Sequence, residues 1–596
     1  GKQLIKKSII FSFCLFLISC GSENKIEDAY TEDLSTLKTT SSGQVIGFKH
    51  KNNSLAWFGI PYAEPPVDEL RWRSPVSKKS EKEIIKATAF SDICFQNRSF
   101  VDYSQEEGKY IGSEDCLYLN IHSPRNLDEN SKLPVMLWIH GGGNTTGAGS
   151  GYDFSKLASE QKVIVITINY RLGPFGWFYH PSLIETSSSK EDKSGNYGLL
   201  DQILALKWVK NNIEQFGGNP DNVTIFGESA GGHNVFSLIS SKLAKGLFHR
   251  AISQSGSTRT TSIEDASNYL DDEKNPGWPT SSREIVNNLL LTSNDAKDLY
   301  EAKILQESMN NLNLKNYLQS LSSSEIFDTY EEAIVAGMFN VPRIIADGYV
   351  LPKEGMEFRR GQFNKVPTML GTNRDEMKLF YALDDDYVYS FSTFLIYVKD
   401  KERYDLENEY ASNNWKIGGV DQPARKLKKS GNLDIYTYRF DWDEEPKYLW
   451  MDFSQIFGAA HGFEIPFVTG NFDYFGFEKY IINDANRQAA MELSNSMMSY
   501  WAEFAYSGNP GKGRKKDLVN WQPWQNGPGK NKSIILDSSN DKGIFMSESE
   551  LFYTDELQRL AEDNRIKDLQ TRCKYIENLK ESGNQSNFSI KECKKL

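Results

Sequence analysis

Short runs of apolar residues, many of them β-branched, recur along the chain and end in glycine or polar residues. One run covers residues 134–139, another covers 224–226, and a third begins at Val366. Such runs predict buried strands whose carboxyl ends open into loops. A helix-like segment follows the second run. The pattern therefore indicates an α/β protein with polar loop residues at the carboxyl edge of a sheet.

The second run leads into Gly227-Glu228-Ser229-Ala230-Gly231, a Gly-x-Ser-x-Gly pentapeptide between a predicted strand and a predicted helix. This layout is typical of a nucleophile elbow, a sharp turn that holds a serine hydroxyl at the top of a sheet. The two glycines allow a close approach that a Cβ would obstruct. Small residues recur by chance, so the pentapeptide needs further support.

A serine nucleophile needs a base, and the chain has seven histidines. Elbow-bearing hydrolases order their triad as serine, acid and histidine, which leaves His233, His249 and His461. His233 lies one helical turn beyond the serine and is expected to be structural. His249 flanks a predicted strand, with no acidic segment before it. Elimination therefore selects His461, in a loop that enters an apolar segment.

The acid must lie between Ser229 and His461. The best segment is the apolar run from Val366, which ends in Gly371 and the polar residues that follow it. There Asp375 and Glu376 are adjacent, and the residue pattern leaves both open as the acid. Upstream, the run 134–139 leads into three consecutive glycines, 141–143, whose amides suit an oxyanion hole together with the amide of Ala230.

These stretches resemble the type-B carboxylesterases, the α/β-hydrolase family that includes cholinesterases, bile-salt lipases and p-nitrobenzyl esterases. The resemblance covers about residues 40 to 545, and its strongest segments lie at 59–63, 114–121, 169–173 and 195–232. It implies a central, mostly parallel, twisted sheet flanked by helices, with large insertions that form the pocket. It also implies a single catalytic domain, assigned here to residues 41–545.

The family pattern implies a role for each matching residue. Ser229 is the nucleophile, His461 the base and Glu376, the second carboxylate of the pair, the acid. The oxyanion donors are Gly142, Gly143 and Ala230. Glu228 and Ser255 match supporting positions beside the triad. The implied reaction is hydrolysis of a carboxylic ester through an acyl-enzyme, with no metal or cofactor.

Two other functions fit parts of this pattern. A binding or adhesion module of the same fold, such as the neuroligins, typically lacks a triad residue, whereas Ser229, Glu376 and His461 are all present. An amidase or carbamate hydrolase would begin with the same acyl-enzyme and stays open. The net charge of −12 argues against a nucleic-acid partner.

The first 20 residues predict export. Lysines precede an apolar run at 9–18, and Leu17-Ile18-Ser19-Cys20 resembles the lipidation box of bacterial lipoproteins. We therefore expect a signal peptide at 1–20, lipidation of Cys20 and a polar linker at 21–40. The protein would then be membrane-anchored in the periplasm or at the cell surface; the alternative is a secreted protein.

Four cysteines remain outside this leader, an even number that agrees with export. The resemblance implies a disulfide between Cys94 and Cys116, in the position of the family's amino-terminal bond. Cys573 and Cys593 lie in a charged, helical tail predicted at 546–596 and are candidates for a second bond.

The substrate is expected to be a small ester. The loop between Cys94 and Cys116 contains no tryptophan, which argues against a choline ester, because cholinesterases use a tryptophan there for cation–π contact. Asn144-Thr145-Thr146 stands where the family often has an aromatic residue after the glycines. This departure favours a more polar ester.

Overall fold

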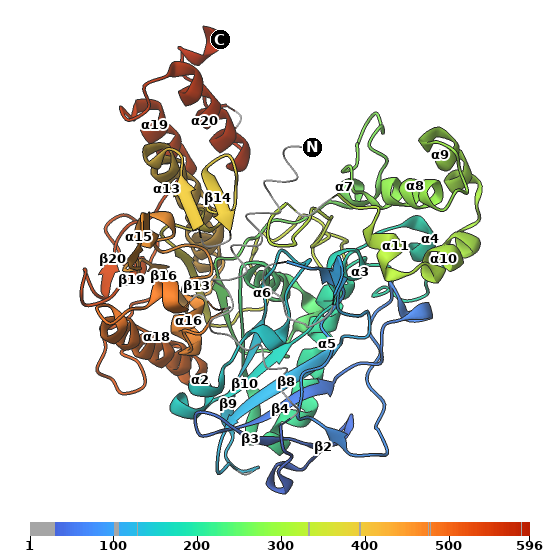
Figure 1. Ribbon diagram of the computed structural model, residues 1–596, viewed down its shortest axis with the longest axis horizontal. Helices are drawn as coiled ribbons and strands as arrows, with labels where there is room; N and C mark the ends of the chain where they lie inside the picture. Colours follow the sequence, from blue (N-terminus) through green and yellow to red (C-terminus); the bar gives the residue numbers. More distant parts are fainter. Residues whose placement is uncertain are drawn as a thin grey trace.

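The computed structural model describes residues 30–99, 107–127, 129–331, 334–392, 395–474, 476, 478–585 and 587–595. The predicted signal peptide, including Cys20, lies outside these residues. Figure 1 shows a large sheet with helices on both sides and with helical insertions above one edge of it.

The main sheet has eleven strands and is parallel through its centre. Its spatial order is β20 (Phe545–Ser547), β19 (Ser533–Leu536), β16 (Ile435–Phe440), β13 (Thr368–Asn373), β12 (Arg250–Gln254), β11 (Gly218–Glu228), β9 (Leu133–Ile139), β10 (Ile164–Ile168), β8 (Tyr118–Pro124), β4 (Ser54–Pro61) and β3 (Phe48–His50). The strands from β10 to β19 pair in parallel, and antiparallel pairs occur only at the two sides. The predicted strands at 134–139 and 224–226 and the run from Val366 correspond to β9, β11 and β13.

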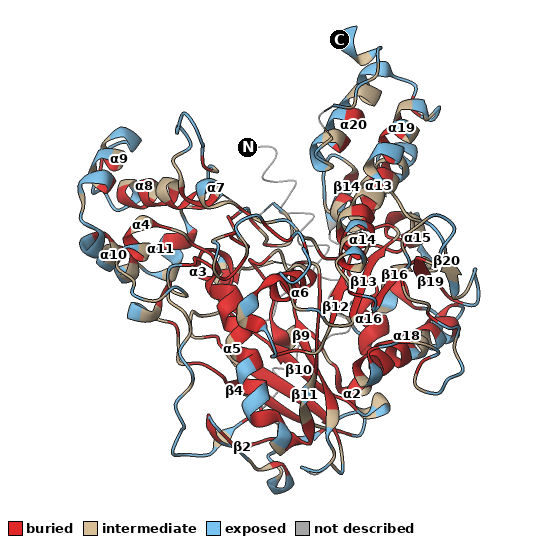
Figure 2. Ribbon diagram, turned by 180° about the vertical axis from the view of Figure 1, so that it is seen from behind, coloured by how far each residue is buried: buried red, intermediate tan, exposed pale blue. Residues whose placement is uncertain are grey.

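Alternation along the strands explains why both faces of the sheet are covered. On β9, Met136 and Trp138 enter one apolar cluster, while Leu137 and Ile139 enter the other. The first cluster packs against α18 (Arg487–Ser507), and the second against α5 (Tyr197–Asn212) and α6 (Ala230–Ser240). Successive residues of a strand point to opposite faces, so a run that is apolar throughout requires helices on both. Figure 2 shows these strands, α5 and α6 as mostly buried.

The parallel register brings the functional loops to one edge of the sheet. Gly227 of β11 pairs with Ile139 of β9, Glu228 pairs with Gln254 of β12, and Gln254 pairs with Gly371 of β13. The loops that follow these strands therefore begin side by side. This is the edge where open α/β sheets place their ligands.

Two insertions and the tail surround this edge. Helices α7 (Ile263–Ser267), α8 (Ser282–Thr292), α9 (Leu299–Ser308), α10 (Asn311–Ser320) and α11 (Ser323–Phe327) follow β12. Helix α13 (Lys401–Lys416), a π-helical turn at Ile417–Asp421 and α14 (Gln422–Lys429) follow β13. The tail forms a hairpin of α19 (Tyr553–Glu562) and α20 (Leu569–Ser582), which stands beside α13 in Figure 1. Tyr410 of α13 shares an apolar cluster with both tail helices.

The folded body begins earlier than the sequence predicted. The segment 34–40, assigned to a polar linker, contains the 3₁₀ turn Leu34–Thr36 and the strand β1 (Lys38–Thr40), which pairs with β2 (Gly43–Ile46). The carbonyl of Thr36 accepts a hydrogen bond of 2.9 Å from the indole of buried Trp57. Polar composition concealed this contact, because the segment is held through its backbone.

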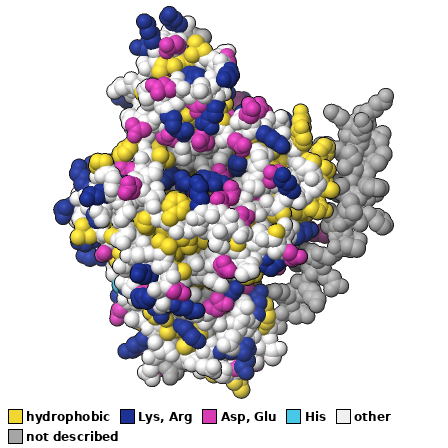
Figure 3. All heavy atoms as spheres, turned by 90° about the vertical axis from the view of Figure 1, so that its left-hand side faces the viewer, with side chains coloured by type: hydrophobic (Ala, Val, Ile, Leu, Met, Phe, Trp, Pro, Cys, Tyr) yellow, Lys and Arg dark blue, Asp and Glu magenta, His cyan; other side chains and the backbone are white. Residues whose placement is uncertain are grey.

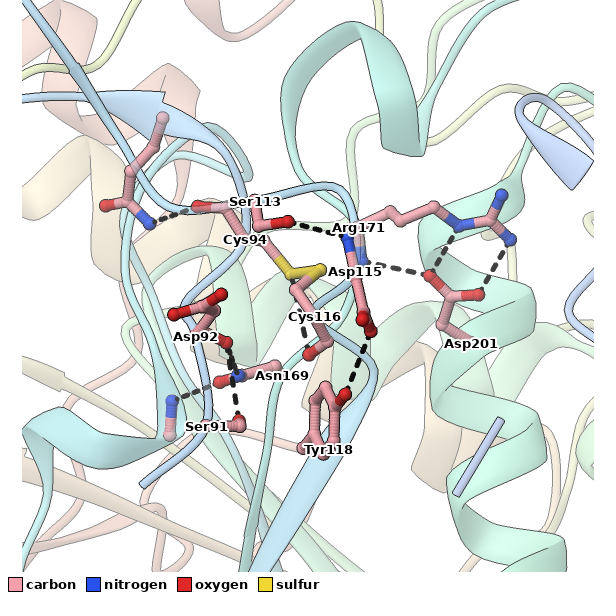
Figure 4. The surroundings of a disulfide bond; sticks show 12 residues. Ser91, Asp92, Cys94, Ser113, Asp115, Cys116, Tyr118, Asn169, Arg171 and Asp201 are labelled. Carbon is pink, nitrogen blue, oxygen red and sulfur yellow. Dashed lines mark hydrogen bonds and ion pairs between the residues drawn. A yellow bond between two sulfur atoms is a disulfide. The ribbon is translucent and has the colours of Figure 1, made fainter. Parts of the chain in front are cut away.

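Both expected disulfides are present, Cys94–Cys116 and Cys573–Cys593. Figure 4 shows the first bond beside the buried ion pair of Arg171 and Asp201, whose side chains lie 2.8 Å apart. The second bond ties the chain that follows α20 back to that helix. None of the helices in the described part of the chain has both the length and the apolar character needed to span a bilayer.

Candidate active site

Ser229 stands at a sharp turn between β11 and α6. Its φ of 58° and ψ of −118° are rare for a residue with a side chain, so the surrounding structure must hold this conformation. A Cβ on Gly231 would lie 1.9 Å from the carbonyl oxygen of Ile139, at the end of β9. A Cβ on Gly227 would lie 2.6 Å from the same oxygen. Both glycines are therefore required by the contact between the elbow and the neighbouring strand.

Glu376 is fully buried in the loop after β13 and is tied down on both carboxylate oxygens. Its Oε1 accepts a hydrogen bond from the hydroxyl of Ser255, which follows β12, and another of 2.8 Å from the backbone N–H of Asn373. Its Oε2 lies 2.5 Å from Nδ1 of His461. The carboxylate therefore holds the imidazole at Nδ1, while Ser255 holds the carboxylate.

Asp375, the other candidate acid, has a different set of partners. Its Oδ2 pairs with Arg374 at 2.7 Å and accepts the N–H of Ala459 at 3.0 Å, while its Oδ1 accepts from Asn408 at 3.1 Å. Burial alone would raise the pKa of Asp375, but the Arg374 guanidinium, the charge of Lys378 and the N–H of Ala459 outweigh it and lower the pKa. Asp375 thus stabilises the loop that carries His461, and Glu376 is the residue that contacts the imidazole.

His461 is buried in the loop before α16 (Ile465–Thr469), where two carboxylates flank its ring. Besides the contact with Glu376, its Nε2 lies 3.2 Å from Oε2 of Glu228. Burial alone would lower the pKa of His461, but the charges of Glu228 and Glu376 outweigh it and raise the pKa to about 9. Among the described residues, no hydrogen bond joins Nε2 to the Ser229 hydroxyl. Such bonds often tighten only when substrate binds.

Two further buried carboxyl groups lie next to this pair. Burial raises the pKa of Glu228 to about 7, with His461 acting in the opposite direction. Burial also raises the pKa of Glu464, and the neighbouring Glu228 and Glu376 add to this effect. Burial therefore disfavours the charged form of Glu464, whereas Glu228 changes charge near neutrality.

The glycine loop lies against the elbow. Gly142 and Gly143 have φ values of +116° and +63°, and a Cβ on Gly142 would lie 2.4 Å from the carbonyl oxygen of Thr146. The turn that brings Thr146 close to Gly142 is closed by two hydrogen bonds. The N–H groups of Thr145 and Thr146 donate to the carbonyl oxygen of Gly142 at 3.1 and 2.9 Å. The N–H groups of Gly142 and Gly143 donate to none of the described residues, so they are free to meet a substrate oxygen.

The other two downstream histidines make structural contacts. Nε2 of His233 lies 2.5 Å from the carbonyl oxygen of Arg259, and Nδ1 of His249 accepts the N–H of Val223 at 2.9 Å. The elimination that selected His461 therefore agrees with the geometry.

Ser229 lines two cavities that differ in polarity. One, of ≈ 190 Å³, is largely apolar, and its lining includes Leu379, Leu383, Phe457, Phe463 and Ile481. The other, of ≈ 1020 Å³, has a mixed wall that includes Ala230 and many serine, threonine, asparagine and glutamine side chains, for which it is called the polar cavity. Because both open onto the same hydroxyl, an ester bound at Ser229 has one part facing apolar side chains and the other facing polar ones.

Several residues that shape the site have no signal in the sequence. The ring of Trp415 lies 4.7 Å from that of His461 between centroids, and Phe380 lies 5.2 Å from it. Residues 582–585, at the end of α20, line the polar cavity although they lie beyond the segments that resemble the family. Asn144 and Thr145 are fully buried, so only Thr146 of that triplet reaches a cavity wall.

Two groups of described residues outside the site have the spacing of cation ligands. They are His50, His122 and Asp153, and Asp443, Asp537 and Asp541, each with ligand atoms within 4.8 Å of one another. Asp153 is already paired with Lys51 at 2.9 Å. Neither group contributes a residue to the cavities at Ser229.

Comparison with known proteins agrees with this geometry. The carboxylesterase family profile matches residues 35–417 and 398–551. The chain is 35% identical over 516 residues to a para-nitrobenzyl esterase of Bacillus subtilis, covering 84% of this chain and 94% of the relative. It is 32% identical over 518 residues to the human cocaine esterase, covering 80% and 85% of the two chains. A solved PNB esterase structure, 31% identical, aligns with a TM-score of 0.62 over 88% of this chain and 99% of its own. The chain therefore belongs to the carboxylesterase family and is a carboxylic ester hydrolase with the α/β-hydrolase fold.

Proposed function

We propose that ester hydrolysis proceeds through an acyl-enzyme on Ser229, with His461 as general base and acid and Glu376 as the group that orients it. The observation that carries this assignment is the contact of 2.5 Å between Nδ1 of His461 and Oε2 of Glu376, in a site where Ser229 and His461 line one cavity. A carboxylate at Nδ1 holds the proton there and leaves Nε2 free to accept the serine proton.

The steps follow from these positions. Ser229 Oγ attacks the ester carbonyl carbon as its proton passes to Nε2 of His461. The N–H groups of Gly142, Gly143 and Ala230 meet the negative oxygen that forms. The C–O bond to the alcohol then breaks, and the alcohol leaves with the proton from Nε2. Water, deprotonated by the same nitrogen, attacks the acyl-enzyme and releases the carboxylic acid and free Ser229.

Glu228 has a supporting part in this proposal. Its carboxylate lies 3.2 Å from Nε2, where positive charge develops as the serine proton is transferred. Ser255 supports the triad from the other side through its hydrogen bond to Glu376.

The test compares Ser229→Ala with Ser257→Ala, a serine of the polar cavity outside the triad. Wild type and Ser257→Ala should hydrolyse 4-nitrophenyl butyrate and be labelled by a fluorescent alkyl phosphonate. Ser229→Ala should lose the labelling and at least about 10³-fold in kcat, because the nucleophile is gone. Equal turnover and labelling of wild type and Ser229→Ala would refute the assignment.

We further propose that the protein is exported as a lipoprotein whose lipidated residue is Cys20. The leader pattern at 1–20 and the two disulfides support an oxidising compartment outside the cytoplasm. When full-length chains are expressed in a bacterial host, wild type should incorporate labelled palmitate and sediment with membranes. Cys20→Ala should do neither. Equal palmitate labelling of both would overturn the lipidation site, and soluble, unlabelled wild type would indicate secretion instead.

A further inference from the structure

Among the residues that the structure describes, two arginines and no acidic residue line the polar cavity beside Ser229. Arg259 and Arg343 line it, and the remaining described lining residues are neutral polar, apolar or histidine side chains. The chain as a whole has 80 acidic and 68 basic residues. On the face drawn in Figure 3, side chains of both charges are interspersed. A cavity with basic and no acidic residues is therefore a local departure from the charge pattern of this protein.

A pair of hydrogen-bonded segments brings the two arginines to the same cavity. The N–H of Thr261 donates to Ile344 at 2.9 Å, and the N–H of Ala346 donates back to Thr261 at 2.9 Å. The Thr261 hydroxyl also donates to the carbonyl oxygen of Arg343 at 2.6 Å. The loop after β12, which carries Arg259, is thus tied to the segment that carries Arg343.

The backbone next to Arg343 is held in an unfavourable conformation. Ile344 has a φ of 50°, a true outlier for a β-branched residue. Such strain persists only where surrounding contacts impose it, and it clusters at functional sites. The backbone beside Arg343 is therefore held in place by the surrounding fold.

Within the described part of the chain, neither arginine has an acidic partner. Among the described residues, no carboxylate lies within ion-pair distance of Arg259 or Arg343, and the only side-chain hydrogen bond of Arg343 goes to the carbonyl of Val341 at 3.2 Å. Burial lowers the pKa of His233, which lines the same cavity, to about 4, and the charges of Arg343 and Arg259 act in the same direction. Arg343 is partly buried and Arg259 is exposed. Because no carboxylate occupies their guanidinium groups, both retain the capacity to bind an oxyanion.

We propose that Arg259 and Arg343 form a subsite for an anionic oxygen group, so that the preferred substrates are esters with a carboxylate or similar oxyanion in the part that enters the polar cavity. This inference rests on the proposed role of Ser229, because it places the anionic part of an ester relative to that hydroxyl. The opposite part of the ester would occupy the apolar cavity. The positive subsite also disfavours a quaternary ammonium group.

The experiment measures the kcat/KM ratio of an anionic ester to its neutral counterpart. One arm puts the charge on the acyl side, with mono-4-nitrophenyl glutarate against 4-nitrophenyl pentanoate. The other puts it on the alcohol side, with 4-acetoxybenzoate against its methyl ester. In at least one arm, the ratio should fall about tenfold in Arg343→Gln and further in the Arg259→Gln, Arg343→Gln double variant. A lost charge-assisted hydrogen bond accounts for that magnitude.

Arg359→Gln is the matched control, because Arg359 is an exposed arginine outside the cavity and should leave the ratio at the wild-type value. A ratio unchanged within twofold in the double variant, in both arms, would overturn the subsite.

Binding measured without turnover separates this inference from the proposed catalytic role. In a Ser229→Ala background, calorimetry should show 4-hydroxybenzoate or glutarate binding more weakly after Arg343→Gln, whatever the esterase assays give. Equal affinity for both anions before and after the substitution would count against the subsite. Loss of the Ser229 assignment alone would leave the binding difference intact.

Discussion

Replacing Glu228 with glutamine should shift the pH dependence of catalysis to lower pH. The base must be neutral to accept the serine proton, so kcat/KM rises with pH through the pKa of His461. With that pKa raised to about 9, the wild-type activity should still be rising between pH 8 and pH 9. Glu228→Gln keeps the shape of the side chain and removes its negative charge next to Nε2.

The size of the shift follows from the distance. Two unit charges 3.2 Å apart interact by about 5 kcal/mol at an effective dielectric constant of ~20. That is an upper bound, because water in the two cavities screens the pair. We therefore expect the apparent pKa of the base to fall by about one to two units, where one unit corresponds to about 1.4 kcal/mol. The plateau value of kcat/KM should also fall, because the imidazolium loses a stabilising charge in the transition state.

The assay is kcat/KM for 4-nitrophenyl butyrate from pH 5.5 to 10, with spontaneous hydrolysis subtracted. Glu464→Gln is the control, because burial and the neighbouring carboxylates raise the pKa of Glu464 and so disfavour its charged form. An acid limb that stays in place or moves to higher pH in Glu228→Gln would refute the reasoning. An equal shift in both variants would assign it to packing rather than to charge.

Three further predictions concern the triad, the elbow and the tail. Glu376→Gln should lower kcat about 10³- to 10⁴-fold through loss of the imidazole orientation, whereas Asp375→Asn should lower kcat less than tenfold and reduce the melting temperature. Steady-state kinetics and calorimetry would compare the two variants, and an Asp375→Asn variant less active than Glu376→Gln would contradict the assignment of Glu376 as the acid. Gly231→Ala should destabilise the protein by several kcal/mol or prevent folding, because the added Cβ would lie 1.9 Å from the carbonyl oxygen of Ile139. A denaturation midpoint equal to that of the wild type would refute the elbow packing. Replacing both Cys573 and Cys593 with serine should lower the stability of the tail hairpin by about 3 kcal/mol, the chain-entropy value for the lost disulfide. The tail should then be cleaved faster in limited proteolysis, and equal cleavage rates in the variant and the wild type would contradict this.

The sequence alone identified the main elements of the site because these depend on local pattern and chain order. Apolar runs predicted β9, β11 and β13, and the glycines around Ser229 predicted the turn. Counting histidines after the serine selected His461. A strand and a tight turn each leave a mark within a few consecutive residues, and an expected triad order selects among histidines by their position along the chain.

Identifying the acid of the triad required more than the local sequence pattern. Asp375 and Glu376 are equivalent as neighbours in a polar loop, and only a family resemblance favoured the second. The structure separates them by their partners, since Arg374 and Ala459 engage Asp375 while His461 contacts Glu376. Which of two adjacent side chains faces a histidine 85 residues away depends on how the loop folds back, and no short-range pattern records that.

Only the tertiary structure decided the environment of Ser229. The sequence pointed to polar residues after the oxyanion glycines, yet Asn144 and Thr145 are buried and the polar wall comes from other segments. Arg259, Arg343, Trp415 and residues 582–585 are brought to one cavity from distant parts of the chain. A strand or an elbow is encoded by neighbours in sequence, whereas a pocket is formed by side chains whose proximity exists only after the insertions and the tail have packed.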